Sequence, residues 1–114
     1  AIGGNDPGSY ILNVTGRVRA NEIEVNTTVA DYVFEDNYQL KTLEEVESFI
    51  EENNHLPGIP SAAEMQAEGM SVGELNKKLL EKIEELTLYL LKQNKKIKSL
   101  EKTVIDLTKN EDYD

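Results

Sequence analysis

Residues 71–110 read SVGELNKKLLEKIEELTLYLLKQNKKIKSLEKTVIDLTKN. Apolar residues recur in this stretch in alternating steps of four and three, over five heptads, with no proline and no glycine after Gly73. The spacing predicts one long α-helix with a single apolar stripe, which its own turns cannot bury, so it predicts partner helices. The predicted stripe comprises a positions Asn76, Ile83, Leu90, Ile97 and Val104 and d positions Val72, Leu79, Leu86, Gln93, Leu100 and Leu107.

The number of partner helices stays open between two and three. Isoleucine at a with leucine at d favours parallel dimers. Polar Asn76 at a and Gln93 at d favour a wider core, as do Leu75, Leu80 and Tyr89 beside the stripe. Lower on the helix, Lys96 at g and Glu101 at the following e would pair between parallel chains, at a few tenths of a kcal/mol.

The length of the chain limits what precedes the coil. Of 114 residues, about seventy remain outside it, which is marginal for a self-sufficient core. We therefore expect the front part to be stabilised by association along the same axis. The predicted organisation is a β-strand shaft at 1–30, a small aromatic and helical region at 31–70, the coil at 71–110 and a tail at 111–114.

The composition excludes several classes of partner. A formal net charge of −10 argues against nucleic acid and against anionic membrane surfaces. No stretch has the roughly twenty apolar residues that span a bilayer, so no membrane insertion is expected. The start, Ala1-Ile2-Gly3-Gly4, lacks the features of a signal peptide, and we expect the chain to be the C-terminal fragment of a longer protein.

Short alternating segments predict a small β-unit near the N-terminus. The segments are Tyr10–Val14, Arg17–Ala20 and Glu22–Val25, and a turn signal at Thr15-Gly16 separates the first two. They are too few to bury both faces, so we expect them to pair or pack with copies from other chains. With the helices that follow, the predicted fold class is α+β.

Three capping boxes mark helix starts after an aromatic segment, Tyr32–Tyr38. They begin at Thr42, Ser61 and Ser71, each followed by glutamate three positions later. The first helix should end near Asn53-Asn54, and Gly69 should end the second. Since the run Leu86–Leu91 is apolar nearly all round, we expect the short helices of residues 42–69 to fold back on this part of the coil.

The chain offers no converging catalytic groups. His55 is the only histidine and there is no cysteine, so a zinc site is not expected. We interpret His55, beside prolines, as a loop residue making a backbone contact. Ser61 and Ser71 are explained as helix caps rather than nucleophiles. We predict no enzyme activity, no catalytic residue, no metal and no cofactor.

Several segments resemble one known module. Residues 30–40, 43–47, 55–61 and 73–90 resemble a C-terminal module that is widespread in Bacteroidetes surface proteins and phage tail-fibre-like proteins. Residues 12–23 resemble the short β-repeat that commonly leads into it. The resemblance covers about Tyr10 to Leu100. It implies an extracellular, cell-surface or virion location.

More distantly, the layout resembles the endosialidase-type intramolecular chaperones. That resemblance implies a β-shaft, a small α-region and a terminal coiled coil, and it favours a parallel homotrimer over a dimer. Many members cut themselves off with a serine and a lysine near a Ser-Asp…Leu-Lys motif. The matching positions are Ala30-Asp31 and Leu40-Lys41, with alanine in place of the serine and a longer gap, which argues against self-cleavage.

Three hypotheses follow. The leading one is a non-enzymatic trimerisation and registration module of a fibrous tail-fibre-like or cell-surface protein. The second is an adhesin-like fibre tip that binds a cell-surface receptor or a glycan through Tyr32, Phe34 and Tyr38. The third is an intramolecular chaperone with self-cleavage.

Overall fold

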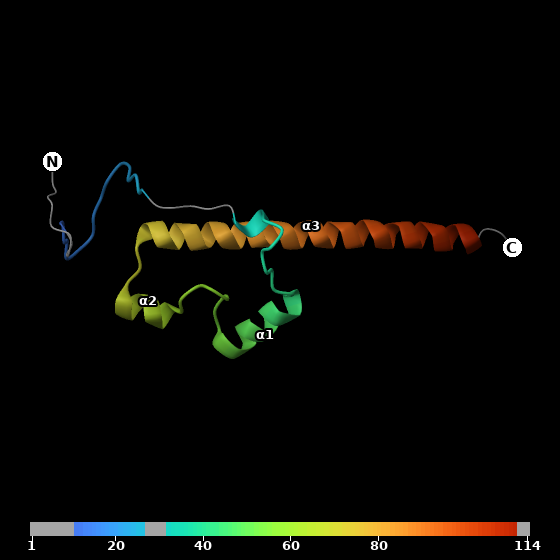
Figure 1. The fold of residues 1–114 in the computed structure, drawn as a ribbon, viewed down its shortest axis with the longest axis horizontal. Helices are drawn as coiled ribbons and strands as arrows, with labels where there is room; N and C mark the ends of the chain where they lie inside the picture. Colours follow the sequence, from blue (N-terminus) through green and yellow to red (C-terminus); the bar gives the residue numbers. More distant parts are fainter. Residues whose placement is uncertain (1–10, 27–31, 112–114) are drawn as a thin grey trace.

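The computed structural model of this chain describes residues 11–26 and 32–111. Its elements are a short 3-10 helix η1 (Tyr32–Phe34) and three α-helices, α1 (Leu43–Asn53), α2 (Ala62–Glu68) and α3 (Val72–Glu111). The molecule is elongated, with extents of 83 × 32 × 31 Å. Its long axis is α3, and α1 and α2 lie to one side of that helix (Figure 1).

The long predicted helix is confirmed as α3, which is 40 residues long. At 1.5 Å per residue it extends for about 60 Å. The Ser71 hydroxyl accepts a hydrogen bond from the Glu74 amide at 3.2 Å, which satisfies one of the free N–H groups of the first turn. Side chains from Asn94 to Lys109 are all exposed, so the lower half of α3 stands alone within the chain.

Helix α1 has the boundaries that local sequence signals predict. Thr42 is its N-cap, and the reciprocal capping box between Thr42 and Glu45 is complete. At the other end Asn54 adopts the left-handed conformation, with φ of 58°, and its amide donates to the Ile50 carbonyl. Asparagine tolerates this conformation better than most residues, which explains why the helix ends there.

Helix α2 is short and has similar ends. The Ser61 hydroxyl accepts from the Glu64 amide, and Gly69 caps the C-terminus with φ of 74°. Glycine adopts positive φ without steric cost. The linker that precedes α2 contains Pro57, which is buried.

The predicted N-terminal β-unit is wrong. Residues 11–26 contain no strand and are exposed throughout, so the fold of the described residues is helical rather than α+β. A strand exists only when its backbone N–H and C=O groups pair with a neighbour, and short alternating segments supply no such neighbour by themselves. Tyr10 and the end of the predicted shaft, 27–30, lie outside the described residues.

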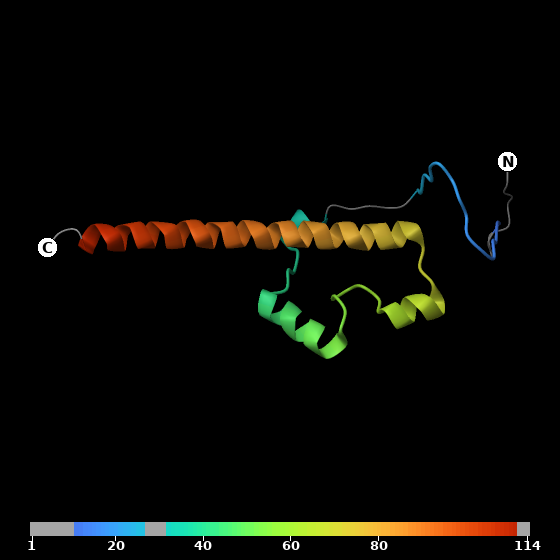
Figure 2. The same cartoon turned by 180° about the vertical axis from the view of Figure 1, so that it is seen from behind.

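The expectation that the short helices fold back on α3 needs correction. Among the described elements, only η1 packs directly against α3. Helices α1 and α2 stand away from it, and the view from behind shows the same separation (Figure 2). The aromatic segment before α1 makes the contact with α3 instead.

None of the described helices is long and apolar enough to cross a membrane.

The capping box of α1 can be tested by substitution. Thr42→Ala removes the acceptor for the Glu45 amide, and loss of such a cap costs about 1 kcal/mol. We expect amide hydrogen exchange in the first turn of α1 to accelerate about fivefold, while α2 is unchanged. Thr42→Ser, which keeps the hydroxyl, is the control. Equal protection in Thr42→Ala and the original chain would contradict this account of the helix start.

Candidate functional site

The predicted a and d positions of α3 form a seam that the rest of the chain leaves uncovered. Nine large apolar side chains of the seam are 47–70% exposed. Of the two polar members, Asn76 is exposed and Gln93 is half-buried. The nine are Val72, Leu79, Ile83, Leu86, Leu90, Ile97, Leu100, Val104 and Leu107.

A different face of α3 holds the segment that precedes α1. We call residues 32–41 the wrap segment. The Tyr32 hydroxyl donates a hydrogen bond to the Glu81 carboxylate, and the Tyr38 hydroxyl donates to Glu85 Oε2 at 2.8 Å. Val33, between them in sequence, is 2% exposed.

Two further contacts from α3 hold the chain beyond the tyrosines. The Tyr89 hydroxyl donates to the Lys41 carbonyl at 2.6 Å, and Lys78 Nζ donates to the Gly58 carbonyl at 3.2 Å. Both acceptors are backbone oxygens in connecting segments, so these bonds fix the course of the chain on either side of α1.

One lysine pairs with both carboxylates that accept the tyrosine hydrogen bonds. Lys82 Nζ lies 2.8 Å from Glu85 and 3.5 Å from Glu81. The rings of Tyr32 and Tyr38 lie 5.9 Å apart, in a tilted arrangement. The result is a small polar network on the outside of the helix, with neighbouring aromatic rings.

The network raises the pKa of its tyrosines. The hydrogen bond to Glu81, then burial and the Glu81 charge, raise the pKa of Tyr32 from 10.0 to about 12. For Tyr38, burial and the bond to Glu85 raise the pKa further above its usual value. Burial raises the pKa of Tyr89 as well. Since the neutral phenol of Tyr32 makes its bond, the stabilisation from that bond is complete below pH 10 and is lost as the pH rises through about 12.

The heptad assignment shows that the wrap segment and the seam use different faces. Glu81 is at f, Glu85 at c, and both Lys82 and Tyr89 are at g. These positions follow one another around the outside of a coiled-coil helix. The wrap segment therefore occupies the outer surface of α3 and leaves the a and d positions available.

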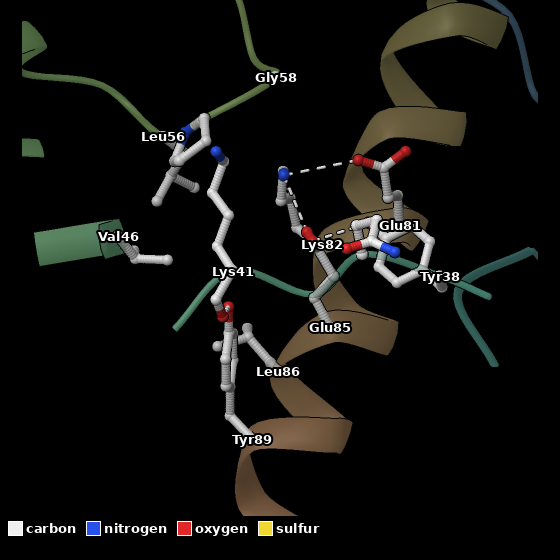
Figure 3. Close-up of a pocket in the computed structure, with 12 residues that line it drawn as sticks. Tyr38, Lys41, Val46, Leu56, Gly58, Glu81, Lys82, Glu85, Leu86 and Tyr89 are labelled. Atoms are coloured by element: carbon white, nitrogen blue, oxygen red, sulfur yellow. Dashed lines mark hydrogen bonds and ion pairs between the residues drawn. The ribbon is translucent and has the colours of Figure 1, made fainter. Parts of the chain in front are cut away.

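An open cavity of about 350 Å³ lies between α1, the linker and α3 (Figure 3). Val46 of α1 and Leu56 of the linker face it from one side, and Leu86 and Tyr89 of α3 face it from the other. Lys41 extends along it. Its lining is mainly apolar, which suits an apolar side chain better than a polar ligand.

The three residues predicted to form a binding tip differ in their contacts with α3. Tyr32 and Tyr38 have their hydroxyls directed at α3 and are half-buried, whereas Phe34 is 53% exposed. A role in receptor or glycan binding stays a prediction.

His55 makes the backbone contact that the sequence suggested. Its Nδ1 lies 3.0 Å from the Leu56 carbonyl oxygen, and its ring meets Phe49 edge-on at 5.4 Å. No group of three potential metal ligands occurs among the described residues. Of the positions that match the self-cleavage motif, Ala30 and Asp31 lie outside the described residues, while the Lys41 carbonyl accepts the bond from Tyr89.

Sequence reasoning missed the residues of α3 that hold the wrap segment. A signal was present, since Lys78, Glu81, Lys82 and Glu85 follow one another at steps of three and one on the outer face. Such charged residues usually indicate a solvated surface. The partners of Glu81 and Glu85 lie 49 and 47 positions earlier in the chain, and that of Lys78 lies 20 positions earlier, which no local pattern reveals.

No protein family, no curated protein and no solved structure matches this chain.

The tyrosine network predicts a specific change in titration. Glu81→Gln removes the negative charge beside Tyr32, so its pKa should fall from about 12 towards 10. Nuclear magnetic resonance of the tyrosine rings as a function of pH measures this for each residue. Glu101→Gln, on the exposed lower half of α3, is the control. An unchanged Tyr32 titration in the Glu81 variant would exclude the contact.

Proposed function

We propose that this chain is a C-terminal trimerisation and registration module of a fibrous tail-fibre-like or cell-surface protein, acting outside the cell or on a virion. The supporting observation is the seam, whose nine large apolar side chains are 47–70% exposed along one helix. Contiguous exposed apolar surface of this kind is typical of interaction sites. Its heptad spacing specifies other helices as the partners.

The energy available from the seam is adequate for association. Burying a fully exposed Val, Leu or Ile side chain contributes about 1.5–3 kcal/mol. With roughly half of each seam side chain exposed, the gain is on the order of 1 kcal/mol per residue, repeated nine times in every chain. Loss of translational and rotational freedom costs about 4–15 kcal/mol in total. Several chains contributing together offset that cost.

The positions beside the seam support a parallel, in-register arrangement. In a parallel coil each g residue lies near the e residue five positions further on in its neighbour. Leu75 then meets Leu80, an apolar pair, and Lys96 meets Glu101, an opposite-charge pair. No g–e pair in this register brings two like charges together. Register is the property that a fibre end must impose on its chains.

The sequence features of α3 support a trimer better than a dimer. Polar Asn76 at a and Gln93 at d are accommodated in a wider core, and Leu75, Leu80 and Tyr89 extend the apolar surface beyond a and d. The resemblance of residues 30–90 to a tail-fibre C-terminal module, and of the layout to trimeric chaperones, points to the same number.

The position of the wrap segment is compatible with this role. Tyr32 and Tyr38 bind at f and c positions, on the side of α3 away from the seam. Three such helices can therefore associate through a and d while each keeps its own wrap segment outside. The module would thus fix chain number at its centre and hold the preceding chain at its surface.

A matched pair of substitutions tests the proposal. Ile97 and Ile105 are the same residue type on the same bare half of α3, with exposures of 52% and 54%. They differ in heptad position, since Ile97 is at a and Ile105 at b. Ile97→Asp should dissociate the oligomer, because a carboxylate in the seam would lose its water. Ile105→Asp should leave it intact.

Analytical ultracentrifugation at micromolar concentration measures the outcome, and circular dichroism checks that both variants remain helical. Equal effects of the two substitutions would show that association does not use the seam. If the chain without substitutions is a monomer, the proposed function is wrong.

A further inference from the structure

Helix α1 stands beside α3 without packing on it. Among the described elements only η1 packs directly on α3, and α1 has no buried residue. Leu43 and Ile50 of α1 remain 43% and 39% exposed. A short amphipathic helix is stable only when its apolar side is covered. The described residues leave this side only partly covered, since Val46 and Phe49 are half-buried while Leu43 and Ile50 are exposed.

The space between α1 and α3 lies on one particular flank of the seam. On α3 the cavity of about 350 Å³ is lined by Lys82 and Tyr89 at g and Leu86 at d, and on its outer side by Glu81 at f and Glu85 at c. A second cavity of about 390 Å³ continues along the same flank, between the start of α1 and residues Tyr89, Gln93 and Lys96. The two cavities share Lys41 and Tyr89 in their linings, and we call them together the g-flank channel.

The opposite flank of α3 carries an apolar residue that neither the a/d pattern nor the g–e pairs explain. Leu91 at b is 53% exposed. In a bare coiled coil, b positions face solvent and are usually polar. Leucine at b in the half of α3 beside α1 therefore indicates a further apolar contact.

A parallel coil brings these two flanks together. The g flank of each helix faces the e flank of its neighbour, and Lys82 lies near Thr87 of the neighbouring copy. In the neighbouring copy, Leu91 follows Thr87 by one helical turn and lies on its outer side. Leu91 of the neighbour is therefore level with Tyr89 of the first copy, which lines both cavities of the channel.

We infer that α1 packs on a second copy of this chain, whose Leu91 fills the channel between α1 and α3 of the first copy. The α1 helix of each copy would then pack on the outer surface of the α3 helix of its neighbour. An apolar space of this size left empty would be costly in a packed interior, whereas a leucine fits its lining of Val46, Leu56 and Leu86. The inference rests on the proposed parallel association and names a contact that the seam alone does not require.

Thiol cross-linking between differently tagged chains tests the contact, and the absence of native cysteine makes the sites unambiguous. One chain carries Val46→Cys and the other Leu91→Cys, and the two are coexpressed and treated with a short thiol cross-linker. A product that contains both tags is expected on a denaturing gel. Val46→Cys paired with Ile105→Cys, two heptads lower at the same b position, should give little product.

A second measurement separates this contact from the seam. Leu91→Ala should raise the dissociation constant of the oligomer about tenfold, while Ile105→Ala, from a position equally exposed in the chain, should change it little. Equal effects of these two substitutions would overturn the inference.

The two proposals fail in different ways. If ultracentrifugation shows a monomer, the proposed function fails and this contact fails with it. If the chain is oligomeric but Val46→Cys links only to Leu86→Cys within one chain, α1 closes on its own α3. The inference is then overturned and the trimerisation module stands.

Discussion

The uncovered seam of α3 is the constraint on which the rest of the structure depends. A helix of 40 residues with apolar side chains at a and d along its length has lower free energy in water only when that stripe is buried. The described remainder of the chain supplies no layer to bury it, since its single fully buried apolar residue is Val33. With so small a core among the described residues, folding of the single chain buries little apolar surface.

The wrap segment shows how this seam is kept available. The chain before α1 could in principle have covered the apolar stripe of α3 and produced a closed monomer. Instead Tyr32 and Tyr38 bind Glu81 and Glu85, whose charges require the outer face to remain near water. Lys82 forms ion pairs with both carboxylates and completes the network. Polar specificity on the outside thus directs the local chain away from the apolar surface.

The parts of the fold that follow from neighbouring residues could be predicted from the sequence. The bounds of α1 depend on Thr42 and Asn54, the end of α2 depends on Gly69, and α3 follows from its spacing. Each of these signals acts within a few residues, so it holds without knowledge of the tertiary structure. The prediction of β-strands was wrong because the alternation of polar and apolar residues around Val18 and Ile23 is also a local signal, whereas a strand needs a partner strand that local sequence does not specify.

The candidate site, too, has a part that the local sequence predicts and a part that depends on the tertiary structure. The members of the seam are identified by periodicity alone, but their association depends on molecules outside the chain. The contacts of Tyr32 and Tyr38 with α3 join positions almost fifty residues apart, and the cavity beside Tyr89 depends on where the linker at Leu56 and Pro57 turns. Such geometry follows from the folded chain and not from a motif.

The mass of the chain in solution tests the central claim most directly. Light scattering on the intact chain at micromolar concentration should give three times the chain mass of 12.8 kDa, with no change on modest dilution. A mass of one chain under these conditions would contradict the account, because an uncovered seam would then need no partner.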